Sequence, residues 1–169
     1  VDARVVGEVA VDVHERGEPI GPGGYDEVVP ARPVHHEVVD QPLVAGVAAL
    51  TTADAIHLAE LGADAGCEGL MVLPPYVYKG DWRETRAHFD AVIGATPLPC
   101  MLYNNPIAYG TDVHPEQMVD LAVSLPNFVA VKESSADVRR VTSLRALLGD
   151  QVAIFVGVDD LVLEAVQEG

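Results

Sequence analysis

Lysine is scarce in this chain, and so is positive charge in general. The 169 residues include two lysines, Lys79 and Lys132, and Lys and Arg together number 10 against 26 Asp and Glu, which gives a formal net charge of −16 and a sequence pI near 4.4. A field of that sign repels nucleic-acid phosphates and anionic lipid surfaces, so we expect no nucleic-acid partner and no membrane partner. An anionic substrate would need local positive groups, such as an amine or a helix N-terminus.

Cysteine is equally scarce, and long apolar runs do not occur. Cys67 and Cys100 are too few for a disulfide framework and are typical of a reducing compartment, so we expect a cytoplasmic protein. No run approaches the roughly 20 apolar residues of a membrane span, and no basic-then-apolar leader is visible, although the chain begins at Val1 rather than Met. His14 and the His35-His36 pair lie near carboxylates without a diagnostic ligand spacing, so we expect no metal and no other cofactor.

The hydrophobic fraction of 49% is ample for a core, and the length suits one domain. Residues 1–40 are rich in turn formers and prolines, and their one strand-like signal is the alternation of Val9, Val11 and Val13 with other residues. From residue 41 the pattern becomes regular. We therefore divide the chain into an unassigned N-terminal segment, 1–40, and a domain, 41–169.

The regular part alternates short apolar runs with amphipathic stretches. Strands are expected at Leu43–Val47, Gly69–Leu73, Pro99–Tyr103, Phe128–Lys132 and Val152–Val156. Helices are expected at Ala53–Ala65, Trp82–Gly94, His114–Ser124, Asp137–Leu148 and Leu161–Gln167. Thr51 or Thr52 is expected to cap the first of these helices and Asp81 the second. Pro115 falls in the first turn of the third helix, and Gly149 ends the fourth.

Strand–helix repeats of about 30 residues imply right-handed parallel βα units. We predict the α/β class and a partial (β/α)8 TIM barrel that lacks the first and last units, with its chemistry at the C-terminal strand ends. A doubly wound open sheet is the alternative, but no glycine-rich phosphate loop follows a first strand.

The most informative stretch is Phe128–Ser135, FVAVKESS. Its four apolar residues, 128–131, are typical of a strand covered on both faces, and Lys132 follows directly. Desolvation at a strand end disfavours the ammonium and favours the neutral amine, which attacks carbonyl carbons. The plainer interpretation is a strand-end lysine whose amine reaches water.

Tyr103 occupies the same place one βα repeat earlier, at the end of the apolar run PCMLY. Neighbouring strands lie about 4.8 Å apart, so the phenol of Tyr103 and the amine of Lys132 are able to reach one substrate. A tyrosine there would relay protons to and from a carbonyl carbon that lysine has captured as an imine. The alternative is an amphipathic ring at the barrel rim.

Residues from about 41 to 169 resemble the dihydrodipicolinate synthase/N-acetylneuraminate lyase family of Schiff-base (class I) aldolases and lyases. The resemblance rests on five stretches in order: LVAGVAALTTADAI (43–56), GLMVLPPYVYK (69–79), MLYNNPIAYG (101–110), FVAVKESS (128–135) and FVGVDD (155–160). It implies that Lys132 forms an imine with a small 2-oxo acid of the pyruvate type and that Tyr103, from the YNxP motif, shuttles protons. It further implies a homo-oligomer and substrate contacts from Tyr76, Ser134, Gly157, Asp159 and Asp160.

The chain departs from the family pattern in three places. The GTTGE loop, which supplies donors to the 2-oxo acid carboxylate, does not occur in the sequence. Val77 stands where a neighbouring subunit's tyrosine joins the proton relay, and Ala108 stands where dihydrodipicolinate synthases have a carboxylate-binding arginine. The presence of both PPYVYK and YNNPIAYG in one sequence resembles one branch of the family. That branch includes the pyrroline-4-hydroxy-2-carboxylate deaminases of hydroxyproline breakdown.

Three hypotheses of function follow. The first is a Schiff-base lyase or synthase acting on a small 2-oxo acid, or, in the deaminase form, on a cyclic imine carboxylate. The second is a catalytically inactive family fragment, and the third is an acidic binding module. About five βα units leave edges at Leu43–Val47 and Val152–Val156, and Arg4–Val13 is able to cover only one of them. We therefore expect a chain that is unstable, aggregation-prone or obligately associated.

Overall fold

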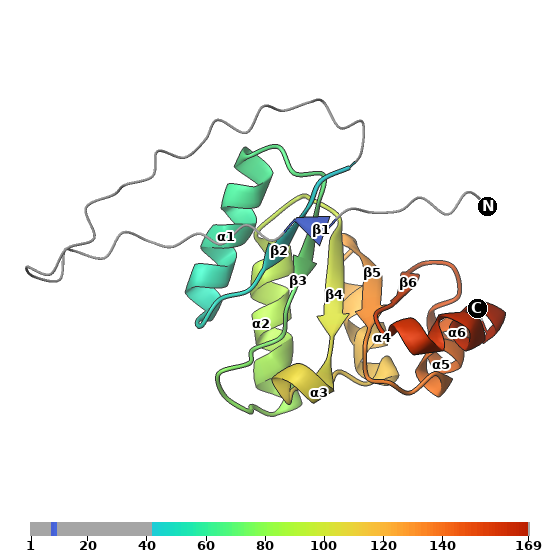
Figure 1. Cartoon of the computed structure of the whole chain (residues 1–169). Coiled ribbons are helices and arrows are strands. Elements are labelled where there is room, and N and C mark those ends of the chain that lie inside the picture. Colours follow the sequence, from blue (N-terminus) through green and yellow to red (C-terminus); the bar gives the residue numbers. More distant parts are fainter. Residues whose placement is uncertain (1–7, 10–41, 169) are drawn as a thin grey trace, which may run out of the picture.

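The computed structural model describes residues 8–9 and 42–168, which form a six-stranded sheet with helices packed against it (Figure 1). The strands are parallel, and their order in the sheet is their order in the chain: β1 (Glu8–Val9), β2 (Val44–Val47), β3 (Gly69–Val72), β4 (Cys100–Asn104), β5 (Phe128–Glu133) and β6 (Ala153–Val156). The helices are α1 (Thr52–Asp64), α2 (Trp82–Gly94), α3 (Pro106–Tyr109), α4 (Pro115–Ser124), α5 (Arg139–Leu148), the short 3₁₀-helix η1 (Asp159–Leu161) and α6 (Val162–Glu168).

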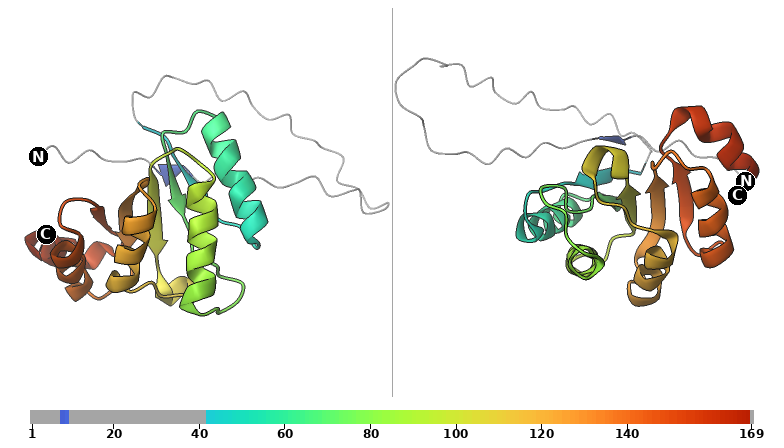
Figure 2. Two further views of the ribbon diagram at one scale, coloured as in Figure 1. Left: turned by 180° about the vertical axis from the view of Figure 1, so that it is seen from behind. Right: turned by 90° about the horizontal axis from the view of Figure 1, so that it is seen from below.

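The predicted α/β class and parallel βα units are confirmed. Helices α1, α2, α4 and α5 lie along one side of the sheet, as both views in Figure 2 show. The short helix α3, directly after β4, was not predicted, because four residues are too few to produce a hydrophobic period.

Strand β1 pairs with β2 and so covers one of the two edges of the predicted five-stranded sheet. Glu8 lies opposite Val44 and Val9 opposite Ala45 in parallel register. The expectation that Arg4–Val13 pairs with an edge strand is therefore confirmed for these two residues. The other residues of that segment, and the histidines at positions 14, 35 and 36, lie outside the described residues.

Local capping chemistry explains where the helices begin and end. The Thr51 side chain accepts a hydrogen bond from the Asp54 N–H, and Asp81 forms a reciprocal capping box with Glu84 at the start of α2. Pro115 occupies the first turn of α4. Gly149 ends α5 with a φ of 58°, a left-handed conformation that a side chain would oppose. All four residues act as the sequence predicts.

The hydrophobic core lies between the sheet and the helices. Strand residues Val47, Val72, Leu102 and Val131 stand side by side across the sheet, and each is at least 98% buried. Phe89, Val92 and Ile93 of α2 pack into the same core. Cys67 and Cys100 are buried free thiols, and burial raises the pKa of Cys100 to about 12, which keeps it protonated.

The expectation that Phe128–Val131 is buried is confirmed for Phe128, Ala130 and Val131, which are at most 6% exposed, but not for Val129. Val129 is 38% exposed and Phe155, on β6, is 37% exposed. The helices α1, α2, α4 and α5 cover one face of the sheet, and we call the opposite face the inner face (Figure 2). Phe155 lies opposite Lys132 in the parallel register. An apolar run of four residues does not by itself reveal which neighbours will cover it.

A buried histidine joins α1, α2 and the end of β3. The Nε2 of His88 lies 3.2 Å from the Leu73 carbonyl oxygen, and its Nδ1 lies 3.0 Å from the Thr52 hydroxyl. A carbonyl only accepts, so Nε2 carries the hydrogen and Nδ1 accepts from Thr52. Burial lowers the pKa of His88 below its ordinary 6.5, although the hydrogen bond to Leu73 acts in the opposite direction.

We predict that protonation of His88 destabilises the fold. The unfolded chain binds a proton near the ordinary pKa while the buried imidazole resists it, so the free energy of unfolding should fall as the pH drops below about 6.5, and level off once the pH has passed the folded-state pKa. Urea unfolding between about pH 8 and pH 5 measures the effect. His88→Gln should flatten this dependence and the exposed His57→Gln should not; equal slopes in the two variants would contradict the assignment.

Candidate functional site

The C-terminal ends of β4 and β5 bring Tyr103 and Lys132 together. The two residues are direct partners in the parallel register, and Lys132 Nζ lies 4.7 Å from the centroid of the Tyr103 ring. Phe155, on β6, is the partner of Lys132 on the other side. The predicted adjacency of the phenol and the amine is thus observed, on the inner face of the sheet. Their catalytic roles stay predictions.

A register shift between β4 and β5 produces this adjacency. Cys100 pairs with Phe128, but Met101 pairs with Ala130, so Val129 is an extra residue on β5. Without the shift, Tyr103 would stand opposite Val131, and Lys132 would lie on the helix-facing side, because successive side chains alternate between faces. The shift therefore places Lys132 on the inner face beside Tyr103.

An aromatic row extends from Tyr103. The Tyr109 ring meets the Tyr103 ring edge-on, with centroids 5.8 Å apart, and the Tyr76 ring lies 5.8 Å from Tyr109 on the other side. The Thr111 hydroxyl donates to the Pro75 carbonyl at 2.8 Å, which ties the end of α3 to the loop that bears Tyr76. The order of rings is Tyr76, Tyr109, Tyr103, and the Lys132 amine lies over the last.

A polar network on the opposite face anchors the same strand ends. Asn104 is fully buried; its Nδ2 donates to Glu133 Oε2 at 3.0 Å and to Asp112 Oδ1 at 3.3 Å, and its Oδ1 accepts from the Val113 N–H at 3.0 Å. The other oxygen of Glu133 accepts from the Ser135 N–H at 2.7 Å. The buried carboxylate therefore fixes the turn that follows Lys132.

Arg140 supports the network from α5. Its guanidinium forms a bidentate ion pair with Asp112, at 2.6 and 2.7 Å. Partial burial acts to raise the pKa of Asp112, but the hydrogen bonds from Arg140 and Asn104 outweigh it and hold that pKa below its ordinary range. Sequence inspection missed this network, because its members are scattered over two strand ends, two loops and a helix.

Ser134 and Gly157 meet beside Lys132. The Ser134 N–H donates to the Asn104 carbonyl at 2.8 Å, and the Gly157 N–H donates to the Glu133 carbonyl at 2.9 Å. The buried Ser134 hydroxyl has no hydrogen-bond partner among the described residues. Asp159 and Asp160 lie farther along, exposed at the start of η1. Of the residues that the resemblance implies, Ser134 and Gly157 adjoin Lys132 directly, and Tyr76 reaches Tyr103 through Tyr109.

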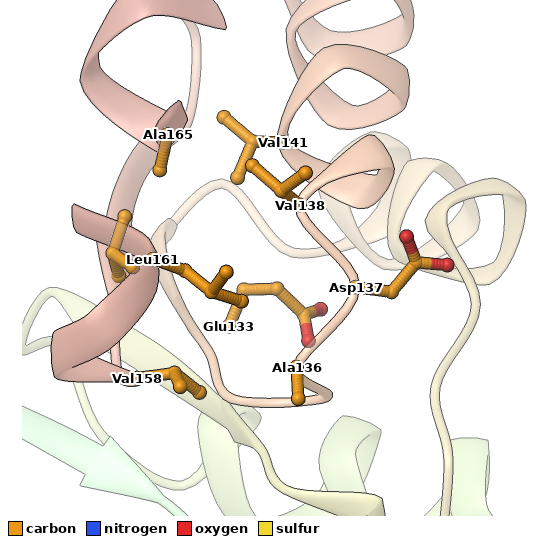
Figure 3. Close-up of a pocket in the computed structure, with 9 residues that line it drawn as sticks. Glu133, Ala136, Asp137, Val138, Val141, Val158, Leu161 and Ala165 are labelled. Atoms are coloured by element: carbon orange, nitrogen blue, oxygen red, sulfur yellow. The ribbon is translucent and has the colours of Figure 1, made fainter. Parts of the chain in front are cut away.

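A small, mostly apolar pocket lies between α5, η1, α6 and the turn after β5 (Figure 3). Glu133, Ala136 and Val138 line one part of it, and Leu161 and Ala165 line another. Ala136 has a φ of 62°, an uncommon conformation for a residue with a side chain. Neither Lys132 nor Tyr103 lines the pocket, and the Glu133 carboxylate already accepts hydrogen bonds from Asn104 and Ser135.

The described residues contain no group of three or more His, Cys, Asp or Glu side chains placed to hold a metal ion. In the same part of the chain, no helix combines the length and apolar character needed to cross a membrane.

Comparisons with a family model and with the sequences of known proteins point to the same family. The model of the dihydrodipicolinate synthetase family matches residues 33–169. A 4-hydroxy-tetrahydrodipicolinate synthase from Desulforamulus reducens is 36% identical over 127 residues, which cover 75% of this chain and 43% of the relative. One from Synechococcus elongatus is 40% identical over 128 residues, covering 75% and 42%.

Solved structures agree with the sequence comparisons. The 4-hydroxy-tetrahydrodipicolinate synthase from Methylacidiphilum fumariolicum SolV superposes with a TM-score of 0.74 at 31% identity, covering 76% of this chain and 43% of that one. A prophage protein of the dihydrodipicolinic acid synthase family from E. coli K12, solved in complex with pyruvate, gives 0.73 at 26% identity, covering 76% and 44%. The chain spans less than half the length of these relatives, and the likeness confirms the partial barrel.

Close packing around Gly157 leaves no room for a side chain unless Ser134 moves. A Cβ there would overlap the Ser134 hydroxyl and lie 3.3 Å from Lys132 Cγ. We predict that Gly157→Ala destabilises the fold by about 1–3 kcal/mol, the usual cost of overpacking, as measured by urea unfolding.

Two further variants test the cause. Adding Ser134→Ala to Gly157→Ala removes the overlapping oxygen and should recover part of the loss. Gly46→Ala is the matched control, because nothing lies within 4 Å of a Cβ at that strand position. A double variant no more stable than Gly157→Ala alone would show that the Ser134 contact is not the cause.

Proposed function

Because the chain belongs to the dihydrodipicolinate synthetase family, we propose that it carries the imine-forming centre of a Schiff-base lyase or synthase that acts on a small 2-oxo acid. The observation that carries the proposal is the pairing of Lys132 with Tyr103 at adjacent strand ends. Two proton-handling groups of this kind on one face are what imine chemistry needs.

In this proposal the Lys132 amine attacks the C2 carbonyl of the 2-oxo acid. The carbinolamine that forms loses its hydroxyl as water, and the carbon–nitrogen double bond of the imine replaces the carbon–oxygen bond. The protonated imine then withdraws electrons from the neighbouring carbon, which allows a carbon–carbon bond to form or break there. Tyr103, whose ring lies against the amine, is the group that gives and takes protons.

Backbone hydrogen bonds within the chain reduce the number of groups near Lys132 that are available to bind a substrate. The N–H groups of Ser134 and Gly157 are engaged with the chain's own carbonyls, so neither is available to a substrate carboxylate. The Ser134 hydroxyl, buried and without a partner among the described residues, is the better candidate. Tyr76 is proposed to contribute through the aromatic row, and Asp159 and Asp160 from η1 toward substrate hydroxyls.

A deaminase acting on a cyclic imine carboxylate is the second candidate. It rests on Ala108, an exposed residue of α3 whose methyl group cannot bind the second carboxylate that synthases engage with arginine. The comparisons give this branch no specific support. Release of ammonia from a cyclic imine carboxylate, set against condensation of pyruvate with an aldehyde, separates the two.

Reductive trapping tests the nucleophile. Borohydride with pyruvate, or with a small panel of 2-oxo acids, should label Lys132, and mass spectrometry should locate the adduct there. Lys132→Ala should abolish labelling without changing the far-UV spectrum, while the exposed Lys79→Ala should label fully. An adduct on Lys79 would refute the assignment, and a well-folded chain that traps no 2-oxo acid would favour the inactive-fragment hypothesis.

We also propose that the chain associates with copies of itself, in a cytoplasmic setting. On α6, Leu163 is 68% exposed and Val166 is 71% exposed, and β6 beside them is paired on one side only within the described part of the chain. Apolar surface next to a strand edge favours association.

Size-exclusion chromatography and thermal unfolding at several protein concentrations measure this association. We expect elution and midpoint to depend on concentration. Charged substitutions at Leu163 and Val166 should weaken that dependence, whereas one at the exposed Val123 of α4 should not. A monodisperse monomer with a concentration-independent transition would overturn the proposal.

A further inference from the structure

Asn105 links the Tyr103 hydroxyl to the start of α3. It follows β4 directly and is the N-cap of α3. Its Oδ1 accepts from the Ala108 N–H at 3.1 Å, and its Nδ2 donates to the Tyr103 hydroxyl oxygen at 3.0 Å. Its backbone carbonyl accepts from the Tyr109 N–H at 3.0 Å. One residue therefore connects the phenol to the helix that carries Tyr109.

The cap determines which way the Asn105 amide faces. The Ala108 N–H is a donor and must meet an oxygen, so the nitrogen of the amide is the atom that points at Tyr103. An amide nitrogen donates and does not accept. The phenol oxygen is therefore the acceptor in this contact, and its own hydrogen is left for another partner.

The Tyr103 ring and helix α3, which Asn105 connects, are each held in place by a further contact. Tyr109 packs edge-on against the Tyr103 ring, and the Thr111–Pro75 hydrogen bond ties down the end of α3. The two hydrogen bonds of Asn105 fix its own side chain. A donor that is already aimed at an oxygen before charge develops there stabilises that charge without further reorganisation.

We propose that Asn105 is a positioning residue for proton transfer by Tyr103: it directs the phenol hydrogen toward the Lys132-bound intermediate and stabilises the phenolate. The proposal rests on the proposed function. The Tyr103 O–H bond breaks and its proton joins the hydroxyl of the carbinolamine, which leaves as water while the lysine nitrogen forms the protonated imine. The phenolate, hydrogen-bonded to Asn105, then takes a proton from C3 of the imine, which restores the phenol and leaves the enamine.

Asn105→Asp separates this role from the cap. Aspartate keeps an oxygen for the Ala108 N–H and caps helices as well as asparagine does, but its carboxylate cannot donate to Tyr103. We expect kcat to fall by about tenfold to a hundredfold, the usual effect of losing a hydrogen bond to a charged group. KM and the equilibrium yield of borohydride-trapped imine should be retained.

A double-mutant cycle decides whether Asn105 acts through Tyr103. Tyr103→Phe alone should lower turnover by about 10²–10⁴-fold, and Asn105→Asp should then cause no further loss. Thr51→Ala, which removes the cap of α1, is the control for helix fraying and should leave kcat unchanged. An equal loss from Asn105→Asp in both backgrounds would overturn the proposal.

A readout that needs no turnover distinguishes failure of the proposed function from failure of this inference. If the unmodified chain traps no 2-oxo acid, the proposed function fails, and the hydrogen bond is then tested by ¹⁵N–¹H spectroscopy. The side-chain amide signals of Asn105 should shift in Tyr103→Phe, which removes only the acceptor oxygen. Unchanged signals would overturn the assignment of Asn105 whatever the activity.

Discussion

The extra residue at Val129 is the constraint on which the site depends. It offsets β5 by one position against β4, and every side chain beyond it exchanges faces relative to an unshifted pairing. Lys132 thereby comes beside Tyr103 on the inner face, and Glu133 comes beside Asn104 on the helix-facing side. One offset thus sets both the reactive pair and the network behind it.

The two faces at this edge of the sheet carry different kinds of polar group. Behind the sheet, the carboxylates of Glu133 and Asp112 are bound by Asn104, Ser135 and Arg140, so their lone pairs are committed to the fold. On the inner face, the groups are a phenol, an amine and a small hydroxyl. Rigid support on one face and reactive groups on the other suit a site that must hold its geometry while protons move.

Local signals predicted most of the fold. Thr51, Asp81, Pro115 and Gly149 mark helix ends through chemistry that needs no distant partner. The pairing of Tyr103 with Lys132 was foreseeable because parallel βα units place their strand ends together. The offset at Val129 was not, because register depends on a partner strand about 30 residues away. The two side-chain hydrogen bonds of Asn105 and the burial of His88 were not foreseeable either. Both depend on atoms that only folding brings close together.

The agreement between strand order and chain order has a kinetic consequence. Only 29 residues separate Asn104 from Glu133, and every pair of strands from β2 to β6 is consecutive. Pairing distances this short keep the entropy of loop closure low at each step. The sheet is therefore able to grow one βα unit at a time as the chain is synthesised, and the lysine meets the tyrosine as soon as the fifth strand docks on the fourth.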